Sequence, residues 1–209
     1  MKKIPSLFER DFEGNRQVID KVKEGSEWVM KGEGRPTVKE DGTSCMIKDG
    51  KLYKRYDAKH GKTPPQGWIP CEEKPDEHTG HWPGWLQISE TAPEDRWHRA
   101  ARDLIHTTDG DGERIIALYK DGTYELIGEK IGGNPYKRKG HSLHLHGSIF
   151  PFDLELPYTF ESIKKYLAEH YLEGIVWHHP DGRMVKIKAK DFGIKWPREE
   201  NVRFINECK

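Results

Sequence analysis

Charged residues on strand-like runs of this sequence are spaced in a way that suits the binding of an anion. In Met184-Val185-Lys186-Ile187-Lys188, the period of two of a β-strand places both lysines on one face and the branched apolar residues on the other. Such a face offers positive charge to an anionic group. Glu125 and Glu173 are acids in or beside other strand-like runs, and Arg55 lies in a third.

Another lysine precedes a tight turn. In Val38-Lys39-Glu40-Asp41-Gly42, Lys39 stands two residues before an Asp-Gly pair, between two strand-like runs. Asp-Gly is a strong turn signal. Taken singly, strand lysines are usually solvated and strand glutamates usually pair with a lysine across the sheet, so these residues have to be interpreted together.

The elements that must position these residues are hairpins and helices. Three strand-like segments surround Asp-Gly turns, at residues 44–57, 114–131 and 174–189. Helical spacing of apolar residues occurs in Phe12–Lys23, Ala92–His106 and Phe160–Leu172, with Thr91 as the expected N-cap of the middle helix and Glu94 completing a capping box. Interspersed helices and antiparallel hairpins predict the α+β class.

A segment rich in Pro, Gly and Trp interrupts this periodicity at about residues 57–90. The segment contains Trp68, Trp82 and Trp85, and three tryptophans argue against a disordered linker. We therefore expect an ordered insertion that packs on the sheet and borders the substrate. The 209 residues otherwise suit a single domain over 1–209.

Composition excludes several classes of protein. Lys plus Arg and Asp plus Glu both number 35, so no global positive field exists and any polyanion site must be a local cleft. Three widely spaced cysteines without a CxxC predict neither a disulfide framework nor a zinc ribbon, and they fit a reducing cytoplasm. No run approaches the roughly 18 apolar residues of a membrane span, and no signal peptide is evident, so we expect no membrane association.

The order of the motifs is more specific than any one of them. KxDG at Lys39–Gly42, a basic strand with Arg55, ELIG at 125–128, EGIV at 173–176 and KIK at 186–188 resemble, in this order, five motifs of the covalent nucleotidyltransferases. This superfamily comprises ATP-dependent DNA and RNA ligases and capping guanylyltransferases. The resemblance implies an antiparallel-sheet adenylation domain with flanking helices.

Within the superfamily, the sequence is most similar to RNA ligases. YELIGEKIGGNPY and EGIVWHHPDGRMVKIK look like the vertebrate-type 5′-3′ RNA ligase family and its microbial relatives. DNA ligases usually carry an arginine shortly after the motif I glycine, where this chain has Thr43, Ser44 and Cys45. Only 21 residues follow Lys188, so we expect no OB domain after motif V, and the 38 residues before Lys39 leave no room for the extra domain of NAD-dependent ligases.

The resemblance implies a mechanism. Lys39 would attack the α-phosphate of ATP to form lysyl-AMP, which then passes to the 5′-phosphate of RNA before a 3′-hydroxyl displaces AMP. A lysine amine of ordinary pKa, about 10.4, is almost all ammonium at neutral pH, so neighbouring cations and a bound metal must favour the free amine. Lys186 and Lys188 would supply that field, and Asp41-Gly42 would aim the nucleophile.

The resemblance also implies a set of binding residues. Glu173 would hold Mg²⁺ or Mn²⁺, Glu125 a ribose hydroxyl or metal-bound water, and Arg55 a phosphate. His146 is the first candidate for the adenine platform and Phe150 the second. The expected nucleotide-binding set is Val38, Lys39, Asp41, Gly42, Arg55, Glu125, His146, Lys186 and Lys188.

Alternatives remain at this point. A guanylyltransferase or a DNA-joining ligase would use the same motifs. A different class is a non-catalytic RNA-binding module with a zinc-stapled loop, in which Cys71, His78 and His81 would join His144 and His146. The grip on RNA would come from the insertion, from Lys137–Lys139, or from a partner protein that presents RNA to a monomer. We expect RNA repair as the role.

Overall fold

The computed structural model describes residues 3–198 except for 60, 78–79, 104–106, 109–113, 116–118, 148–153 and 155. The chain forms two compact units. Unit 1 comprises Met1–Lys3 and Asp41–His146, and unit 2 comprises Ile4–Glu40 and Gly147–Lys209. Each unit has a buried apolar cluster of its own. That residues 1–209 make a single domain stays a prediction.

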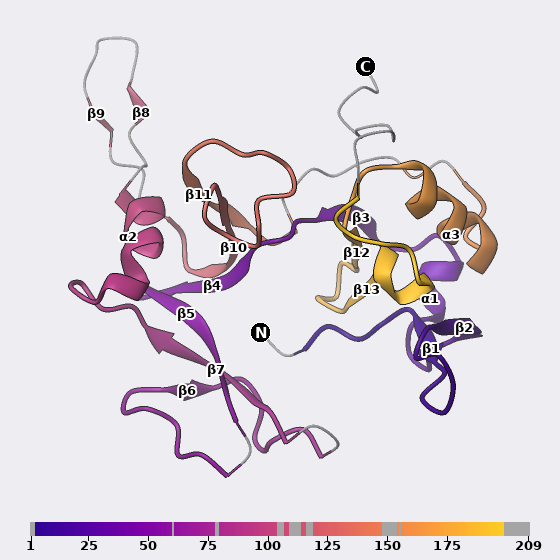
Figure 1. Cartoon of the computed structure of the whole chain (residues 1–209), viewed down its shortest axis with the longest axis horizontal. Coiled ribbons are helices and arrows are strands. Elements are labelled where there is room, and N and C mark those ends of the chain that lie inside the picture. The colour runs from indigo at the N-terminus through magenta and orange to yellow at the C-terminus, as the bar shows by residue number, and fades with distance from the viewer. Residues whose placement is uncertain are drawn as a thin grey trace. The chain divides into compact units, whose positions relative to one another are not determined.

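Unit 2 is built on a three-stranded antiparallel sheet in the order β13-β12-β3 (Figure 1). The strands are β3 (Arg35–Lys39), β12 (Gly174–His178) and β13 (Met184–Lys188). The hairpin predicted over Pro180-Asp181-Gly182 is confirmed, because β12 pairs with β13 from His178–Met184 to Gly174–Lys188. Alternation along these strands sends Val38, Trp177 and Ile187 into the core.

The remaining elements of unit 2 cover the apolar face of this sheet. They are β1 (Phe8–Arg10), β2 (Val18–Val22), α1 (Glu27–Met30), α3 (Phe160–Glu169) and the 3₁₀ helix η2 (Ala189–Phe192). The predicted helix at Phe160–Leu172 is confirmed as α3, which is capped by the Thr159 hydroxyl accepting from the Ser162 backbone N–H at 3.2 Å. Ile163 and Leu167, one turn apart, are fully buried in the core.

The predicted helix at Phe12–Lys23 is wrong. Val18–Val22 forms β2, which pairs antiparallel with β1. Two side chains stabilise the turn between β1 and β2. Asp11 Oδ1 accepts a hydrogen bond from Gly14 N, and Asn15 Oδ1 accepts one from Gln17 N. Val18, Ile19 and Val22 are β-branched and favour a strand, and Phe12 is 76% exposed rather than part of an apolar face.

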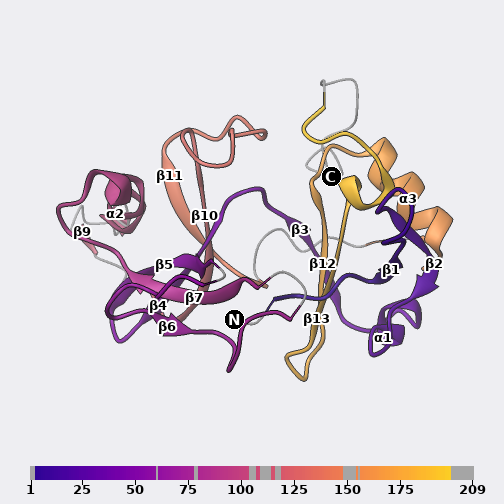
Figure 2. The same ribbon diagram turned by 60° about the horizontal axis from the view of Figure 1, so that its bottom comes forward.

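Unit 1 is built on a six-stranded antiparallel sheet in the order β11-β10-β4-β5-β7-β6 (Figure 2). The strands are β4 (Thr43–Lys48), β5 (Lys51–Ala58), β6 (Ile69–Pro70), β7 (Trp82–Gln87), β10 (Gly122–Gly128) and β11 (His141–Leu145). The hairpin predicted over Asp49-Gly50 is confirmed: Lys48 pairs with Lys51, and both turn residues have positive φ, as a type I′ turn requires.

The hairpin predicted over Asp121-Gly122 is wrong. β10 pairs with β4 and β11 rather than with the chain before the turn. In the described residues, β9 (Arg114–Ile115) pairs with β8 (Thr107–Thr108) instead. Asp121 is a bend and Gly122 is already the first residue of β10, so the Asp-Gly pair does not form a hairpin turn here.

The Trp-rich segment contributes a short strand and several tryptophan contacts. β6 pairs with β7 at Ile69–Trp85 and Pro70–Gly84. Trp68 Nε1 donates to the Tyr56 carbonyl at 3.0 Å, and its ring meets that of Trp82 edge-on. Trp85 is 3% exposed. The tryptophans of the segment therefore pack on the sheet, whereas most of its described residues between 59 and 81 are exposed.

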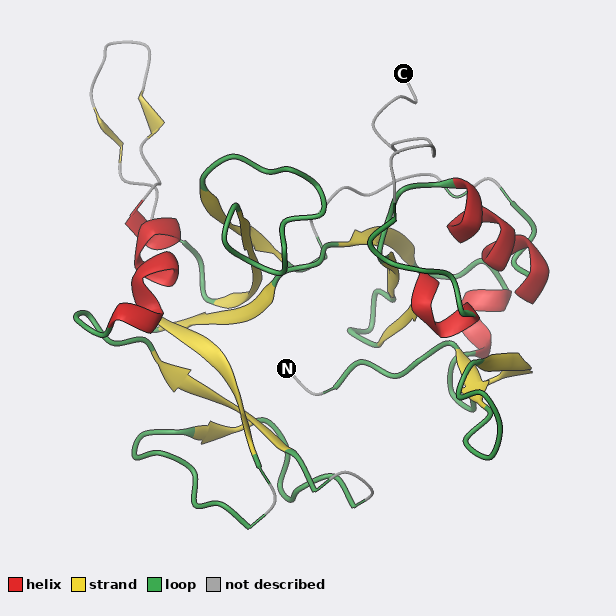
Figure 3. Cartoon of the chain, viewed as in Figure 1, coloured by secondary structure: helices red, strands yellow, loops and turns green. Residues whose placement is uncertain are grey.

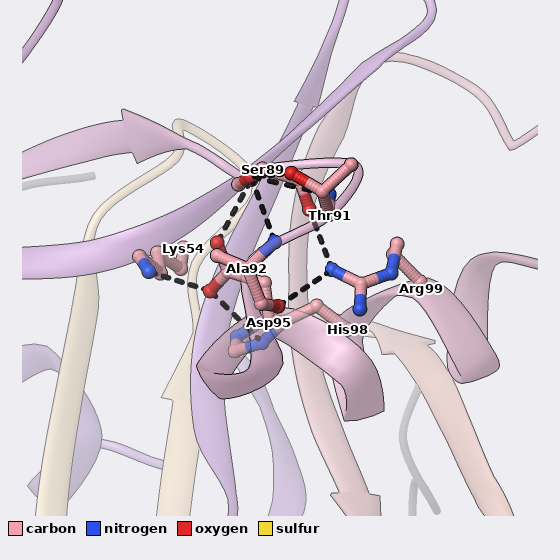
Figure 4. Close-up of polar contacts among 7 residues, drawn as sticks. All are labelled: Lys54, Ser89, Thr91, Ala92, Asp95, His98 and Arg99. Carbon is pink, nitrogen blue, oxygen red and sulfur yellow. Dashed lines mark hydrogen bonds and ion pairs between the residues drawn. The ribbon is translucent and has the colours of Figure 1, made fainter.

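The middle helix begins later than predicted, and the predicted N-cap is wrong, because Ala92 rather than Thr91 is the N-cap residue and no side chain caps it. A 3₁₀ turn, η1 (Pro93–Asp95), leads into α2 (Arg96–Asp103), and residues 104–106 lie outside the described residues. The Ser89 hydroxyl, not Thr91, accepts from the backbone at Thr91 and Ala92. Asp95 accepts from Lys54 Nζ and, at 2.8 Å, from Ser89 N (Figure 4). This network attaches α2 to β5.

Helices and antiparallel sheets together confirm the α+β class (Figure 3). None of the helices in the described residues is long and apolar enough to cross a membrane.

Candidate active site

The polar face of the unit 2 sheet gathers three of the lysines singled out above. The register places Gly174 opposite both Lys39 and Lys188, and Val176 opposite both Thr37 and Lys186. Lys39, Lys186 and Lys188 therefore lie on one face, across three neighbouring strands. Val38 points to the opposite face and is 7% exposed in the core, so only its backbone could contact a nucleotide.

Gly174 lets the strands approach one another at the centre of this row. A Cβ at this position would lie 2.2 Å from the Ile187 carbonyl oxygen and 2.9 Å from Lys188 Cα. Both are backbone atoms, which cannot move without displacing β13. The glycine of EGIV is thus required by packing between Lys39 and Lys188.

Lys39 forms an ion pair with Glu173. Lys39 Nζ lies 2.6 Å from Glu173 Oε2, and the two side chains are 23% and 11% exposed. The backbone of Glu173 is fixed as well, because its carbonyl accepts from Ala189 N at 2.9 Å. Two residues 134 positions apart in the chain are therefore held in contact on the lysine-bearing face.

Lys186 occupies an unfavourable position for an ammonium ion. Burial, followed by the neighbouring charges of Lys39 and Lys188, lowers its pKa to about 8, although Asp191 and Glu173 have the opposite effect. A cationic residue that is partly desolvated beside two like charges favours the binding of an anion, because an anion would relieve that repulsion.

Thr37 and His178 are further polar residues of the same face, and neither belongs to the predicted set of site residues. The Thr37 hydroxyl lies 3.0 Å from His178 Nε2 and donates to the Val176 carbonyl at 3.2 Å. Thr37 precedes Lys39 by two residues, so the period of two in Thr37-Val38-Lys39 was a signal that could have identified it.

Unit 1 brings together two other predicted residues. Glu125 lies on β10 and His146 just after β11, and His146 Nε2 is 3.0 Å from Glu125 Oε2. Gly42 packs its backbone against β10, where a Cβ would meet the Leu126 carbonyl at 2.4 Å. Phe150, the second candidate for the adenine platform, lies outside the described residues.

Arg55 lies elsewhere in unit 1. Its Nε is 2.8 Å from Asp57 Oδ1, its guanidinium stacks over Trp85, and it lines a cavity of about 860 Å³ beside the Trp-rich insertion. Strand β5, which carries Arg55, is separated from β10 by β4, so Arg55 does not lie on a strand next to the Glu125–His146 pair. Its role as a phosphate clamp stays a prediction.

The zinc alternative gains no support from the described residues. No group of three His, Cys, Asp or Glu side chains among them could hold a metal ion. His144 contacts Ser142 and His146 contacts Glu125, while His78 lies outside the described residues. On the lysine-bearing face, Glu173 is the carboxylate that could bind a metal ion. A metal site there would need further ligands from a bound substrate.

Comparison with known proteins decides the family. A family model described as RNA ligase 1 matches residues 48–207. The chain belongs to the RNA ligase 1 family. The predicted relationship to RNA ligases is thereby confirmed.

Several members of the RNA ligase 1 family are similar over much of the chain. RNA ligase 1 of Pongo abelii is 30% identical, over 78% of this chain and 68% of that protein. RNA ligase 1 of Danio rerio is 33% identical, over 59% of this chain and 44% of that protein. RNA ligase 1 of Rattus norvegicus is 32% identical, over 65% and 50% respectively. The aligned part thus spans between 44% and 68% of these relatives.

The family match begins at Lys48, so Lys39 and the Asp-Gly turn precede it. Glu125, Glu173, Lys186 and Lys188 lie within it. The pairing of Lys39 with Glu173 therefore connects a residue before the matched segment to one inside it.

Proposed function

We propose that this chain is an ATP-dependent RNA ligase that joins 5′-phosphate and 3′-hydroxyl RNA ends through a lysyl-AMP intermediate on Lys39. The observation that carries the proposal is the Lys39–Glu173 contact of 2.6 Å on a sheet face shared with Lys186 and Lys188. Membership of the RNA ligase 1 family supports the same reaction class.

In the first step, Lys39 Nζ attacks the α-phosphorus of ATP. A nitrogen–phosphorus bond forms, the bond between the α-phosphorus and the bridging oxygen breaks, and pyrophosphate leaves. The amine has to lose a proton, and Glu173 Oε2 at 2.6 Å is within hydrogen-bond reach to accept it. The same contact orients the amine before attack.

Lys186 and Lys188 act on the phosphate rather than on the proton. Their ammonium groups lie on strands next to Lys39 and would neutralise the charge that grows on the phosphate oxygens in the transition state. Because Lys186 is partly buried, its interaction with a phosphate would be stronger than that of a solvated lysine.

Two transfers complete the reaction. An oxygen of the RNA 5′-phosphate attacks the AMP phosphorus, which releases Lys39 and forms an RNA–adenylate with a pyrophosphate linkage. The 3′-hydroxyl of the second RNA end then attacks the 5′-phosphorus, a phosphodiester forms, and AMP leaves. Lys39 returns to its pair with Glu173.

A divalent metal fits these residues when substrate phosphates complete its shell. Mg²⁺ is commonly bound by one or two carboxylates together with substrate phosphates, and Glu173 would be the carboxylate in unit 2, with Glu125 as the second candidate. Bound there, Mg²⁺ or Mn²⁺ would neutralise charge on the phosphates and the leaving pyrophosphate.

The adduct itself is the first test. Intact mass after incubation with ATP and Mg²⁺ should show a gain of one AMP in the wild type and none in Lys39→Ala or Lys39→Arg. GTP should give no adduct. A matched control is Lys21→Ala, which removes an exposed lysine of the same unit and should label like the wild type. No adduct on the wild type with any nucleotide would exclude the proposal.

The nucleic-acid substrate needs a second assay. RNA with a 5′-phosphate and a 3′-hydroxyl should be sealed, and the all-DNA equivalent should be sealed much more slowly. Equal sealing of both would assign the chain to DNA joining, and adduct formation with GTP alone would assign it to capping chemistry. A role in cytoplasmic RNA repair, as a monomer or with a partner protein that presents RNA, is part of the same proposal.

A further inference from the structure

The segment Pro5–Leu7 runs along the free edge of β13, beside Lys186. Ser6 and Lys186 form a parallel bridge. Leu7 N donates to the Lys186 carbonyl at 2.8 Å, and Lys186 N donates to the Pro5 carbonyl at 3.0 Å. Both backbone hydrogen-bonding groups of Lys186 are therefore bonded by this segment, which acts as a fourth strand of the lysine-bearing sheet.

Strand β1, which follows directly on Pro5–Leu7, is linked to Lys188 through a buried carboxylate. Arg10, at the end of β1, places Nη2 at 2.6 Å from Asp191 Oδ1. Asp191 Oδ2 accepts from the backbone N–H of Lys188 at 2.9 Å. Each oxygen of Asp191 thus has a protein partner. The residue is only 4% exposed, so water hardly reaches this carboxylate. Arg10 also donates to the Arg16 carbonyl, which fixes its orientation.

Besides stabilising the β1–β2 hairpin, Arg10 neutralises the charge of Asp191. Asp191 is a buried negative charge close enough to raise the pKa of Lys186, against the lowering effect of burial. Without Arg10, this carboxylate would lack its counterion and would attract the ammonium groups of Lys186 and Lys188 in its place. Lysines drawn to Asp191 are no longer placed for a phosphate on the polar face.

We infer that the N-terminal segment Pro5–Arg10 is a positioning element for Lys186 and Lys188, with Arg10 neutralising Asp191 so that both lysines stay available to the phosphate. The inference rests on the proposed adenylylation of Lys39. It assigns Arg10 and Asp191 as positioning residues that touch no substrate, and it makes the first strand of the chain part of the catalytic apparatus.

The test is the single-turnover rate of Lys39–AMP formation as a function of ATP concentration, together with the thermal unfolding midpoint. Arg10→Ala should lower the maximal rate by about tenfold to a hundredfold, because misplaced charge at the reacting phosphate has effects of that size. Arg10→Lys should recover part of the rate. Lys21→Ala, the control on the adjacent strand β2, should match the wild type.

A second substitution separates positioning from structural support. Asp191→Asn retains an oxygen that can accept from Lys188 N but removes the negative charge. Combined with Arg10→Ala, it should therefore restore much of the lost rate. Asp191→Asn also removes the buried charge that Arg10→Ala leaves without its counterion, so it should raise the unfolding midpoint as well. The rates are therefore compared at a temperature at which all variants are fully folded, where a hairpin that served only for stability would leave the rate of Arg10→Ala unchanged.

The outcomes are distinguishable. A wild type that labels normally and an Arg10→Ala variant that labels at the same rate would overturn this inference and leave the proposed function intact. A slow Arg10→Ala variant that melts lower, and that Asp191→Asn does not rescue, would also overturn it. A wild type that forms no adduct would overturn the proposed function, and this inference with it.

Discussion

Replacing Lys186 by methionine should stabilise the protein at neutral pH and abolish its adenylylation. The ammonium of Lys186 is charged at pH 7 although burial and the cations of Lys39 and Lys188 lower its pKa to about 8. Methionine has a similar length and no charge, so it removes the electrostatic cost while filling most of the space. The same substitution removes a positive charge from the predicted phosphate site, so activity and stability should change in opposite directions.

The magnitude follows from linkage between protonation and folding. The pKa falls from 10.5, the ordinary value, to about 8 in the folded protein, which corresponds to about 3 kcal/mol. Below pH 8 the group is charged in both states and the full cost applies. Between pH 8 and 10.5 the unfolded chain holds more protons than the folded one, so the stability of the wild type rises with pH and the cost disappears.

Urea-induced unfolding at pH 7 and pH 10 measures this effect. Lys186→Met should exceed the wild type by roughly 2–3 kcal/mol at pH 7, and the gap should shrink markedly at pH 10. Lys164→Met, which removes an exposed lysine from α3, is the matched control and should leave the pH dependence of the wild type unchanged. A gap that is the same at both pH values, or a variant less stable than the wild type at pH 7, would refute the electrostatic reasoning.

Three further substitutions test the site and its scaffold. Glu173→Gln should slow AMP-adduct formation by about a hundredfold or more, since it removes the carboxylate that orients and deprotonates Lys39, and labelling at the wild-type rate in an intact-mass time course would contradict that role. Gly174→Ala should destabilise the chain by about 1–3 kcal/mol in urea and reduce labelling as well, because the added Cβ meets backbone atoms of β13. Asp95→Asn should cost about 3 kcal/mol because it leaves the Lys54 ammonium without its partner, and an unfolding curve that superimposes on the wild type would show that the network carries no net stability.

Local patterns in the sequence predicted local structure well. The Asp49-Gly50 turn and most of the helix predicted at Phe160–Leu172, which forms α3 from Phe160 to Glu169, appear where turn chemistry and apolar spacing place them. The failures occurred where two local signals competed or where a partner had to be chosen. Residues 12–23 have helical spacing, but the β-branched residues after a turn stabilised by side chains form a strand instead. Strand β10 pairs with β4 and β11 rather than with the chain preceding it.

The side chains available for chemistry can be read from the order of residues: the lysine before the Asp-Gly turn, the alternating lysines of β13 and the glutamate before Gly174. Which of these side chains contact one another follows from the packing of the strands. Lys39 pairs with a residue 134 positions away, and Arg10 with one 181 positions away, because sheet register and buried charge, rather than neighbours in the chain, set these contacts. A periodic pattern assigns a residue to a face, but pairing across strands depends on the free energy of the whole packed unit.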